Sequence, residues 1–125
     1  MKLIWYTNGS KTPQGTGAGI YEYSETENAQ YSISLGKHTS VFQAEVYAIL
    51  HCAKENTTKA YVNRRINIFS DSQAALKALT NPKVTSRLVW ECQKELENLT
   101  DYNRVTLLWV PGHSEIQGNE KNLNS

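Results

Sequence analysis

The sequence lacks the usual signals of a membrane or secreted protein. Its 125 residues contain no apolar run approaching the length of a membrane span, and Met1 leads directly into strand-like sequence rather than a signal peptide. Only two cysteines are present, Cys52 and Cys92, and they do not have the spacing of metal ligands. We therefore expect free thiols in an intracellular protein, cytoplasmic or nuclear, that has no membrane partner.

An excess of charge of either sign is also lacking. The chain carries 13 basic and 12 acidic residues, a formal net charge of +1. Proteins dedicated to nucleic acids commonly show a basic surplus or a basic stripe, so any such function here has to rest on a local cluster. Internal repeats and low-complexity tracts are absent, and 39% hydrophobic with 20% charged residues is typical of a globular protein. We expect a single domain over residues 1–125.

Hydrophobic periodicity predicts five strands and three full helices. The strands are expected at residues 2–7, 18–23, 30–35, 66–69 and 105–110. Helices are expected at about 41–56, between Ser72 and Asn81, and at about 84–99, and residues 117–125 indicate the start of a last helix that is cut short. Short linkers predict that the first three strands form an antiparallel meander, to which helical crossovers add two parallel strands. The predicted fold class is α/β: a five-stranded mixed sheet with flanking helices.

Polar residues gather where the central strands are expected to end. Asp71 directly follows the buried fourth strand, where an open α/β sheet presents its ligand-binding crevice. An aspartate before a helix is often only an N-cap, so Asp71 alone does not argue for chemistry. Right-handed crossovers, however, would place Asn8 next to Asp71, with Glu45 reaching the same point from the crossover helix and His113 at the rim. Because Glu45 lies within an apolar helix face, its carboxylate is expected either at the edge of that face or directed at a positive group.

Five stretches in series resemble the ribonuclease H family, and the likeness is greatest to the ribonuclease H domains of non-LTR retroelement reverse transcriptase polyproteins. The resemblance covers nearly the whole chain in the family's order and spacing. The stretches are Tyr6-Thr7-Asn8-Gly9-Ser10, Gly15-Thr16-Gly17-Ala18-Gly19, Ser40-Val41-Phe42-Gln43-Ala44-Glu45, Ser70-Asp71-Ser72-Gln73-Ala74-Ala75-Leu76, and Trp109-Val110-Pro111-Gly112-His113-Ser114 through Gly118-Asn119-Glu120-Lys121.

The resemblance implies endonucleolytic hydrolysis of the RNA strand of an RNA–DNA hybrid. The family uses two Mg²⁺ ions, with Mn²⁺ as a substitute, held by four carboxylates, and it needs no small-molecule cofactor. Hard cations prefer such oxygen ligands, and paired ions suit the in-line displacement of a phosphodiester. We expect a monomer whose partner is the hybrid and whose metal ligands are Glu45 and Asp71.

Two of the family's four carboxylates are missing from this chain. Asn8 stands where the first is expected, and Asn122 followed by Leu123 stands where the fourth is expected. An amide oxygen carries no charge to offset two divalent cations, and Glu120 has the wrong helical phase to replace position 123. Two hypotheses stay open: a ribonuclease H with impaired catalysis and weakened metal binding, or a catalytically inactive nucleic-acid-binding or structural remnant of a retroelement.

Several other residues match family positions that contact substrate. Gly9, Ser10, Ser72 and Gln73 are similar to positions that touch the hybrid's backbone or minor groove, and His113 is similar to a loop histidine that assists proton handling or product release. The alternatives are an ordinary turn at Gly9-Ser10, a surface residue at Gln73 and a loop residue without a task at His113. Tryptophans at positions 5, 90 and 109 all lie within strand or helix patterns and are expected in the core.

Overall fold

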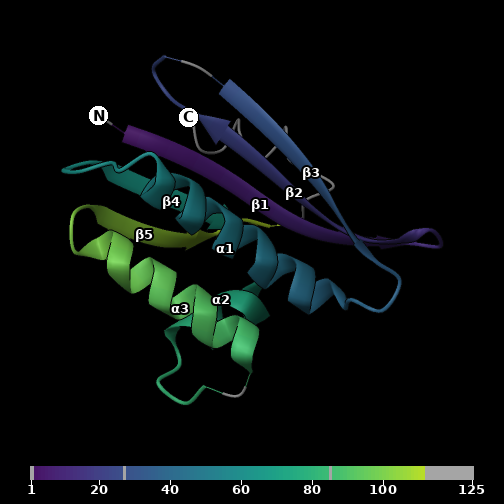
Figure 1. Ribbon diagram of the computed structural model, residues 1–125. Helices are drawn as coiled ribbons and strands as arrows, with labels where there is room; N and C mark the ends of the chain where they lie inside the picture. The colour runs from purple at the N-terminus through teal and green to yellow at the C-terminus, as the bar shows by residue number, and fades with distance from the viewer. Residues whose placement is uncertain (1, 27, 85, 112–125) are drawn as a thin grey trace.

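Five strands and three helices make up the described part of the chain (Figure 1). The computed structural model describes residues 2–26, 28–84 and 86–111. The strands are β1 (Lys2–Thr12), β2 (Gly15–Tyr23), β3 (Asn28–Gly36), β4 (Arg65–Ser70) and β5 (Arg104–Trp109). The helices are α1 (Val41–Thr58), α2 (Gln73–Thr80) and α3 (Arg87–Thr100). None of the described helices is long and apolar enough to cross a membrane.

The strands form one mixed sheet in the order β3-β2-β1-β4-β5. β1, β2 and β3 pair antiparallel, whereas β1, β4 and β5 run parallel to one another. This arrangement confirms the predicted fold class, an antiparallel meander extended by two parallel strands. It also brings the carboxyl end of β4 beside the middle of β1, because the last register pair is Thr7 with Ser70.

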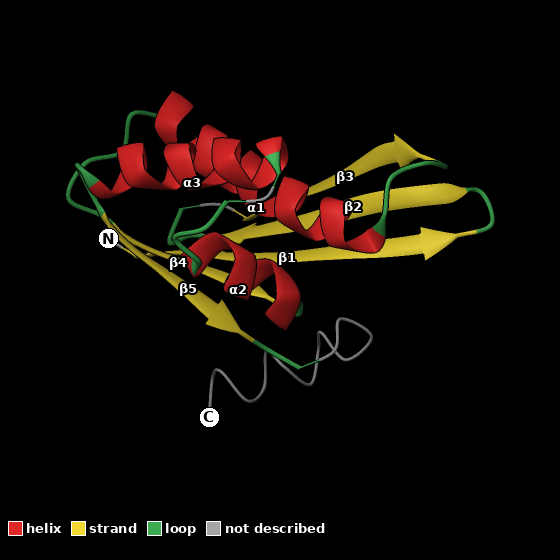
Figure 2. Cartoon of the chain, turned by 90° about the horizontal axis from the view of Figure 1, so that it is seen from below, coloured by secondary structure: helices red, strands yellow, loops and turns green. Residues whose placement is uncertain are grey.

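The helices lie along one side of the sheet, as Figure 2 shows for α1 and α3. Leu3 and Trp5 of β1 point into this main core, which also contains residues from all three helices. Alternate residues of the same strand point to the other face, where Tyr6, Phe69 and Val110 form a smaller buried cluster. The Tyr6 and Phe69 rings stack there with centroids 5.1 Å apart. Because successive residues of a strand point to opposite faces, the sheet has one face that is covered by the helices and a second face that carries the aromatic cluster. We call the second face, on which no described helix lies, the strand-only face.

Strand β1 is longer than predicted. The sequence Asn8-Gly9-Ser10 was expected to end the strand, but pairing with β2 continues through Lys11–Thr16 to Thr12–Gly15. Only Pro13 and Gln14 remain as the hairpin turn. The prediction was wrong because turn-forming residues are tolerated within a strand where a neighbouring strand supplies the hydrogen bonds.

Both ends of helix α1 are defined by local hydrogen bonds. At the start, Ser40 and Gln43 form a reciprocal capping box, with distances of 2.9 and 3.0 Å. At the end, the amide of Ala60 donates to the Thr57 carbonyl and that of Tyr61 to the Asn56 carbonyl, which is the Schellman arrangement. Ala60 accordingly adopts a positive φ of 54°, a conformation that favours glycine.

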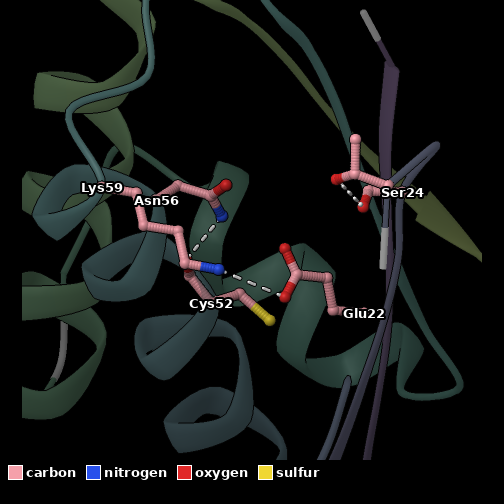
Figure 3. A network of polar contacts seen from close by, with 6 residues as sticks. Glu22, Ser24, Cys52, Asn56 and Lys59 are labelled. Carbon is pink, nitrogen blue, oxygen red and sulfur yellow. Dashed lines mark hydrogen bonds and ion pairs between the residues drawn. The ribbon is translucent and has the colours of Figure 1, made fainter. Parts of the chain in front are cut away.

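A buried carboxylate of β2 forms an ion pair with a lysine at the end of α1. Glu22 is only 1% exposed, and its Oε1 lies 3.4 Å from Nζ of Lys59 (Figure 3). In the same view, the Asn56 side chain donates a 2.7 Å hydrogen bond to the Cys52 carbonyl. The Cys52 and Cys92 thiols are free and buried. Burial raises the pKa of Cys52 well above its usual value and that of Cys92 to about 12.

The expectation for the tryptophans was correct only for Trp5, which is fully buried. Trp90 and Trp109 are each 48% exposed. The face of α3 that packs on the core carries Val89, Cys92 and Leu96, which leaves Trp90 outside, with Lys94 Nζ 5.8 Å from its ring centroid. Trp109 is the last residue of β5, which is an edge strand of the sheet formed by the described residues.

Candidate functional site

Glu45 is a buried carboxyl group in the second turn of α1. It is 3% exposed, and its neighbours Ala44 and Val46 are fully buried. The amide of Gly9 donates to Glu45 Oε1, and the Ser70 hydroxyl donates to Oε2 over 3.4 Å. Its orientation is therefore fixed by one donor from β1 and one from β4. Its burial contradicts the expected position at the edge of the apolar face, whereas a carboxyl directed at a positive group stays a prediction.

The contact between β1 and α1 requires a glycine at position 9. A Cβ atom there would lie 2.8 Å from Glu45 Oε1 and 3.0 Å from both the Ala44 Cβ and the Glu45 amide nitrogen. Such distances are too short for a side chain, so any other residue would push the helix away from the strand. Gly9 is thus buried beneath Glu45, and its fixed role in the structure is to let the helix and the strand approach each other.

Asp71 reaches the same point from the end of β4. Ser70 is buried, and its hydroxyl also accepts a 3.1 Å hydrogen bond from the Ser72 amide. Ser72 is the N-cap of α2 and accepts from the Ala75 amide at 3.0 Å. The cap expected in this stretch is therefore provided by Ser72, which leaves the half-buried Asp71 to face Glu45. Glu45 and Asp71, with Gly9 and Ser72, line a shallow pocket of about 340 Å³.

The two carboxyl groups compete for ionisation. The pKa of Glu45 is raised from 4.5 to about 9, first by burial and then by a hydrogen bond with Asp71 and by the Asp71 charge. The hydrogen bonds from Gly9 and Ser70 lower it, but by less. At neutral pH the pair therefore holds a proton. A divalent cation between the carboxylates would replace that proton.

Asn8 lies at the same level of the sheet but lines a different depression. It is one position beyond the last β1–β4 pair, Thr7 with Ser70, and it pairs with Gly19 of β2. A Cβ atom on Gly19 would lie 2.8 Å from Asn8 Oδ1, so the Asn8 amide rests over this glycine. Asn8 and Ser10 line a groove of about 690 Å³ on the strand-only face, and this groove shares no lining residue with the pocket that holds Glu45 and Asp71.

The remaining predicted site residues are divided between surface positions and the end of the chain. Ser10 and Gln73 are exposed, Ser10 on β1 and Gln73 as the first residue of α2. Neither of them lines the pocket that holds the carboxyl pair. His113, Glu120 and Leu123 lie outside the described residues, so their predicted roles stay predictions.

The donor set fits one hard divalent cation. Glu45 and Asp71 provide two carboxyl groups in one pocket, and Asn8 provides a neutral amide oxygen one position beyond the last β1–β4 pair. No group of three or more acidic, histidine or cysteine side chains that could hold a metal occurs within the described ranges. A pair of cations would need an anionic bridging ligand at position 8, which an amide does not supply.

Fold and site together define an α/β protein with paired carboxyl groups beyond the carboxyl end of a central parallel strand. Solved structures share this architecture. An amino-terminal RNase H domain from Mycobacterium tuberculosis, solved as a fusion with maltose-binding protein, has a TM-score of 0.70, 15% identity, and coverage of 90% of this chain and 88% of that chain. RNase H1 from the halophilic archaeon Halobacterium salinarum has a TM-score of 0.70, 21% identity, and coverage of 96% and 90%.

The sequence profile of the RNase H family matches residues 1–122. The chain therefore belongs to the RNase H family. Members of this family act on RNA–DNA hybrids and typically use divalent metals.

Two residues of the site were not singled out from the sequence as parts of it. Ser70 was part of a quoted stretch without a role of its own, yet its hydroxyl links Glu45 to the start of α2. Gly19 was part of a quoted glycine-rich stretch without a role, yet it provides the space for Asn8. The glycine spacing was the available signal for Gly19; for Ser70 the only signal was its position directly before Asp71.

Proposed function

We propose that this chain binds RNA–DNA hybrids across the middle of β1 and the carboxyl end of β4 and hydrolyses the RNA strand with impaired efficiency. The observation that carries the proposal is the Glu45–Asp71 pair at the end of a central strand, in which Glu45 is buried and Asp71 is half-buried. The resemblance of the motifs to non-LTR retroelement domains supports the further proposal that the chain derives from such an element.

The proposed metal ligands are Glu45 and Asp71, with Asn8 as a weak third. A bound Mg²⁺ or Mn²⁺ would polarise the phosphodiester and supply an activated water. The protein's own residues hold the site ready: the Gly9 amide and the Ser70 hydroxyl fix the Glu45 carboxyl, and Ser72 anchors the turn that presents Asp71. In the absence of a cation, the proton held by the pair keeps the pocket from carrying two adjacent negative charges.

Impaired catalysis follows from the charge at position 8. Substituting an amide for a carboxylate keeps the shape of the side chain but removes one unit of negative charge from the donor set. The hybrid can then still lie against exposed Ser10 and Gln73 while cation affinity falls. Leu123, which stands where the resemblance implies a fourth carboxylate, removes a second charge in this proposal.

The test is hybrid cleavage in Mg²⁺ and in Mn²⁺ by the chain, by Asn8→Asp, and by Asn8→Asp with Leu123→Asp. We expect weak or no cleavage by the parent and stepwise recovery in the variants. Efficient cleavage by the parent would refute the ligand argument and direct attention to Glu120.

The second candidate function is a catalytically inactive hybrid-binding or structural module. It is favoured by one observation: within the described residues the carboxyl pair has no third acidic partner. Hybrid binding measured in EDTA separates the candidates. If the repaired variants do not cleave but the chain still binds hybrid with a salt-dependent affinity, the binding module is the better description. A correctly folded chain that does neither has a purely structural role.

A further inference from the structure

Three basic residues lie side by side at the end of the sheet opposite the carboxyl pair. Lys2 pairs with Arg65 in the β1–β4 register, and Arg65 pairs with Arg104 in the β4–β5 register. All three are exposed. We call Lys2, Arg65 and Arg104 the basic row. Figure 2 shows the starts of the three strands together at one end of the sheet, near the point marked N.

The basic row points to the strand-only face. In-register residues of parallel strands point to the same side of a sheet. The next residues along the strands, Leu3, Ile66 and Val105, belong to the helix-covered core, so the row must point the other way. With neighbouring strands about 4.8 Å apart, the row is about 10 Å long. Phosphates follow one another at about 3.4 Å per strand along a duplex axis, so a row of this length can contact more than one phosphate.

The protein itself gives no reason for three adjacent cations. Like charges on neighbouring strands oppose sheet formation. None of the ion pairs among the described residues includes a member of the row; those pairs join Lys59 to Glu22, Arg87 to Glu91, and Lys94 to Glu97. A row that is unfavourable for folding and has no ion-pair partner among the described residues is suited to an external anion.

Beside the row lies a recess with an exposed aromatic ring. The recess has a volume of about 520 Å³, and its lining includes Arg64, Arg65, Arg104 and Tyr102. The Tyr102 side chain is 65% exposed, the most exposed of the large hydrophobic residues described. The Arg64 guanidinium lies 5.7 Å from the Tyr61 ring centroid and adds a fourth positive charge.

The loops that carry this recess are held together by hydrogen bonds. Asn103 is 8% exposed; its side chain accepts from the Arg64 amide at 3.0 Å and donates to the Tyr61 carbonyl at 2.8 Å. The Asn63 amide donates to the Tyr102 carbonyl at 2.7 Å. The position of Tyr102 relative to the arginines is therefore fixed before any ligand binds, which lowers the cost of binding.

We propose that the basic row and Tyr102 form a second nucleic-acid site, which binds an unpaired strand. Proteins bind single-stranded nucleic acids with two elements: cationic side chains that follow the phosphate backbone, and aromatic side chains on which the bases stack. A paired base does not offer its face to Tyr102, so the ligand is a single strand rather than a duplex. The row lies about 20 Å from Asp71, six residues further along β4 at about 3.3 Å each, so the site is separate from the carboxyl pair.

The proposal does not depend on hybrid hydrolysis and is tested without divalent ions. A fluorescent single-stranded thymidine oligonucleotide is titrated in EDTA, by anisotropy, over a range of salt concentrations. The test variant is Arg65→Gln with Arg104→Gln. The matched control is Lys54→Gln with Lys94→Gln, which removes the same charge from exposed positions on α1 and α3.

We expect the test variant to bind about 10-fold more weakly at low salt. Its slope of log affinity against log salt should be shallower by about 1.4, twice the single-strand value of about 0.7 per phosphate contact. For the control variant, the loss of affinity and the change in slope should both be less than half as large. Equal losses in the two double variants would overturn the proposal, since binding would then follow net charge alone. Both melting temperatures are measured to confirm that the variants are folded.

Tyr102 supplies an independent test. Tyr102→Ala should weaken oligonucleotide binding about 5-fold or more, whereas Tyr102→Phe, which keeps the ring, should bind like the parent. Unchanged binding by Tyr102→Ala would overturn the stacking role. Polyglutamate is the competitor: if it displaces the oligonucleotide at equal charge concentration, the site is for acidic polypeptides and the assignment to nucleic acid is wrong.

Discussion

Replacing Glu45 with glutamine should stabilise the metal-free protein at neutral pH. The native Glu45 carboxyl must stay protonated beside Asp71, since burial and that neighbour raise its pKa from 4.5 to about 9. Glutamine keeps the shape, can accept from the Gly9 amide and can donate to Asp71, but needs no proton. The substitution therefore removes a conflict and keeps the contacts.

The magnitude follows from proton linkage. Between pH 4.5 and about 9 the native state binds more protons at this site than the unfolded chain, so the free energy of unfolding falls as pH rises through this window. At pH 7, which is 2.5 pH units above the ordinary pKa of this carboxyl group, the free energy of unfolding is lowered by at most about 3.4 kcal/mol, at about 1.36 kcal/mol per pH unit. Because the pocket is open to water on the Asp71 side, we expect about 1–2 kcal/mol. This corresponds to about 4–8 °C in melting temperature.

The assay is thermal unfolding in EDTA from pH 5 to pH 8.5, with Glu25→Gln as an exposed control. The advantage of Glu45→Gln over the parent should grow with pH, and Mg²⁺ should stabilise the parent but not the variant. A variant that is less stable than the parent at pH 8, or whose advantage is the same at every pH, would refute the linkage argument.

Three further predictions concern other parts of the fold. Ala60→Gly should stabilise the protein by about 0.5–1 kcal/mol, because Ala60 has a positive φ of 54° at the end of α1. Chemical denaturation measures this change, and a loss of stability would contradict the prediction. Lys59→Met should destabilise by about 1–3 kcal/mol because it leaves Glu22 buried without its cation, and adding Glu22→Gln should restore most of the loss in the same experiment. Cys52 and Cys92 should react with a thiol reagent only as fast as the protein unfolds, because both are buried and burial raises both pKa values. Rapid labelling of the native protein would contradict this and would show that the core opens locally.

The fold could be predicted because its signals are local. The alternation along β1 and the helical spacing of Ala44, Ala48 and Cys52 reflect burial on one face, and these patterns are written directly in the sequence. The extension of β1 through Gly9 could not be predicted in this way. The reason for that glycine is the closeness of α1, a contact between residues 36 positions apart.

The chemistry of the site was only partly predictable. A carboxylate inside an apolar helix face marked Glu45 as unusual, but its partners come from two other segments, Gly9 from β1 and Ser70 with Asp71 from the end of β4. The basic row is a still clearer case. Lys2, Arg65 and Arg104 are far apart in the sequence, and only the strand register brings them together.

The hydrogen bond from the Gly9 amide to Glu45 also affects how the protein ages. Asparagine followed by glycine is prone to deamidation, in which the glycine nitrogen attacks the asparagine side-chain carbonyl. In the native sheet that nitrogen donates to Glu45, and Asn8 is held in an extended strand paired with β2, so the attacking geometry is not available. Deamidation should therefore follow unfolding, and its product, a mixture of aspartate and isoaspartate, would place a carboxylate at position 8. The extent of deamidation is in this way coupled to unfolding, and protein that has spent time unfolded would carry at position 8 the carboxylate that the native chain lacks.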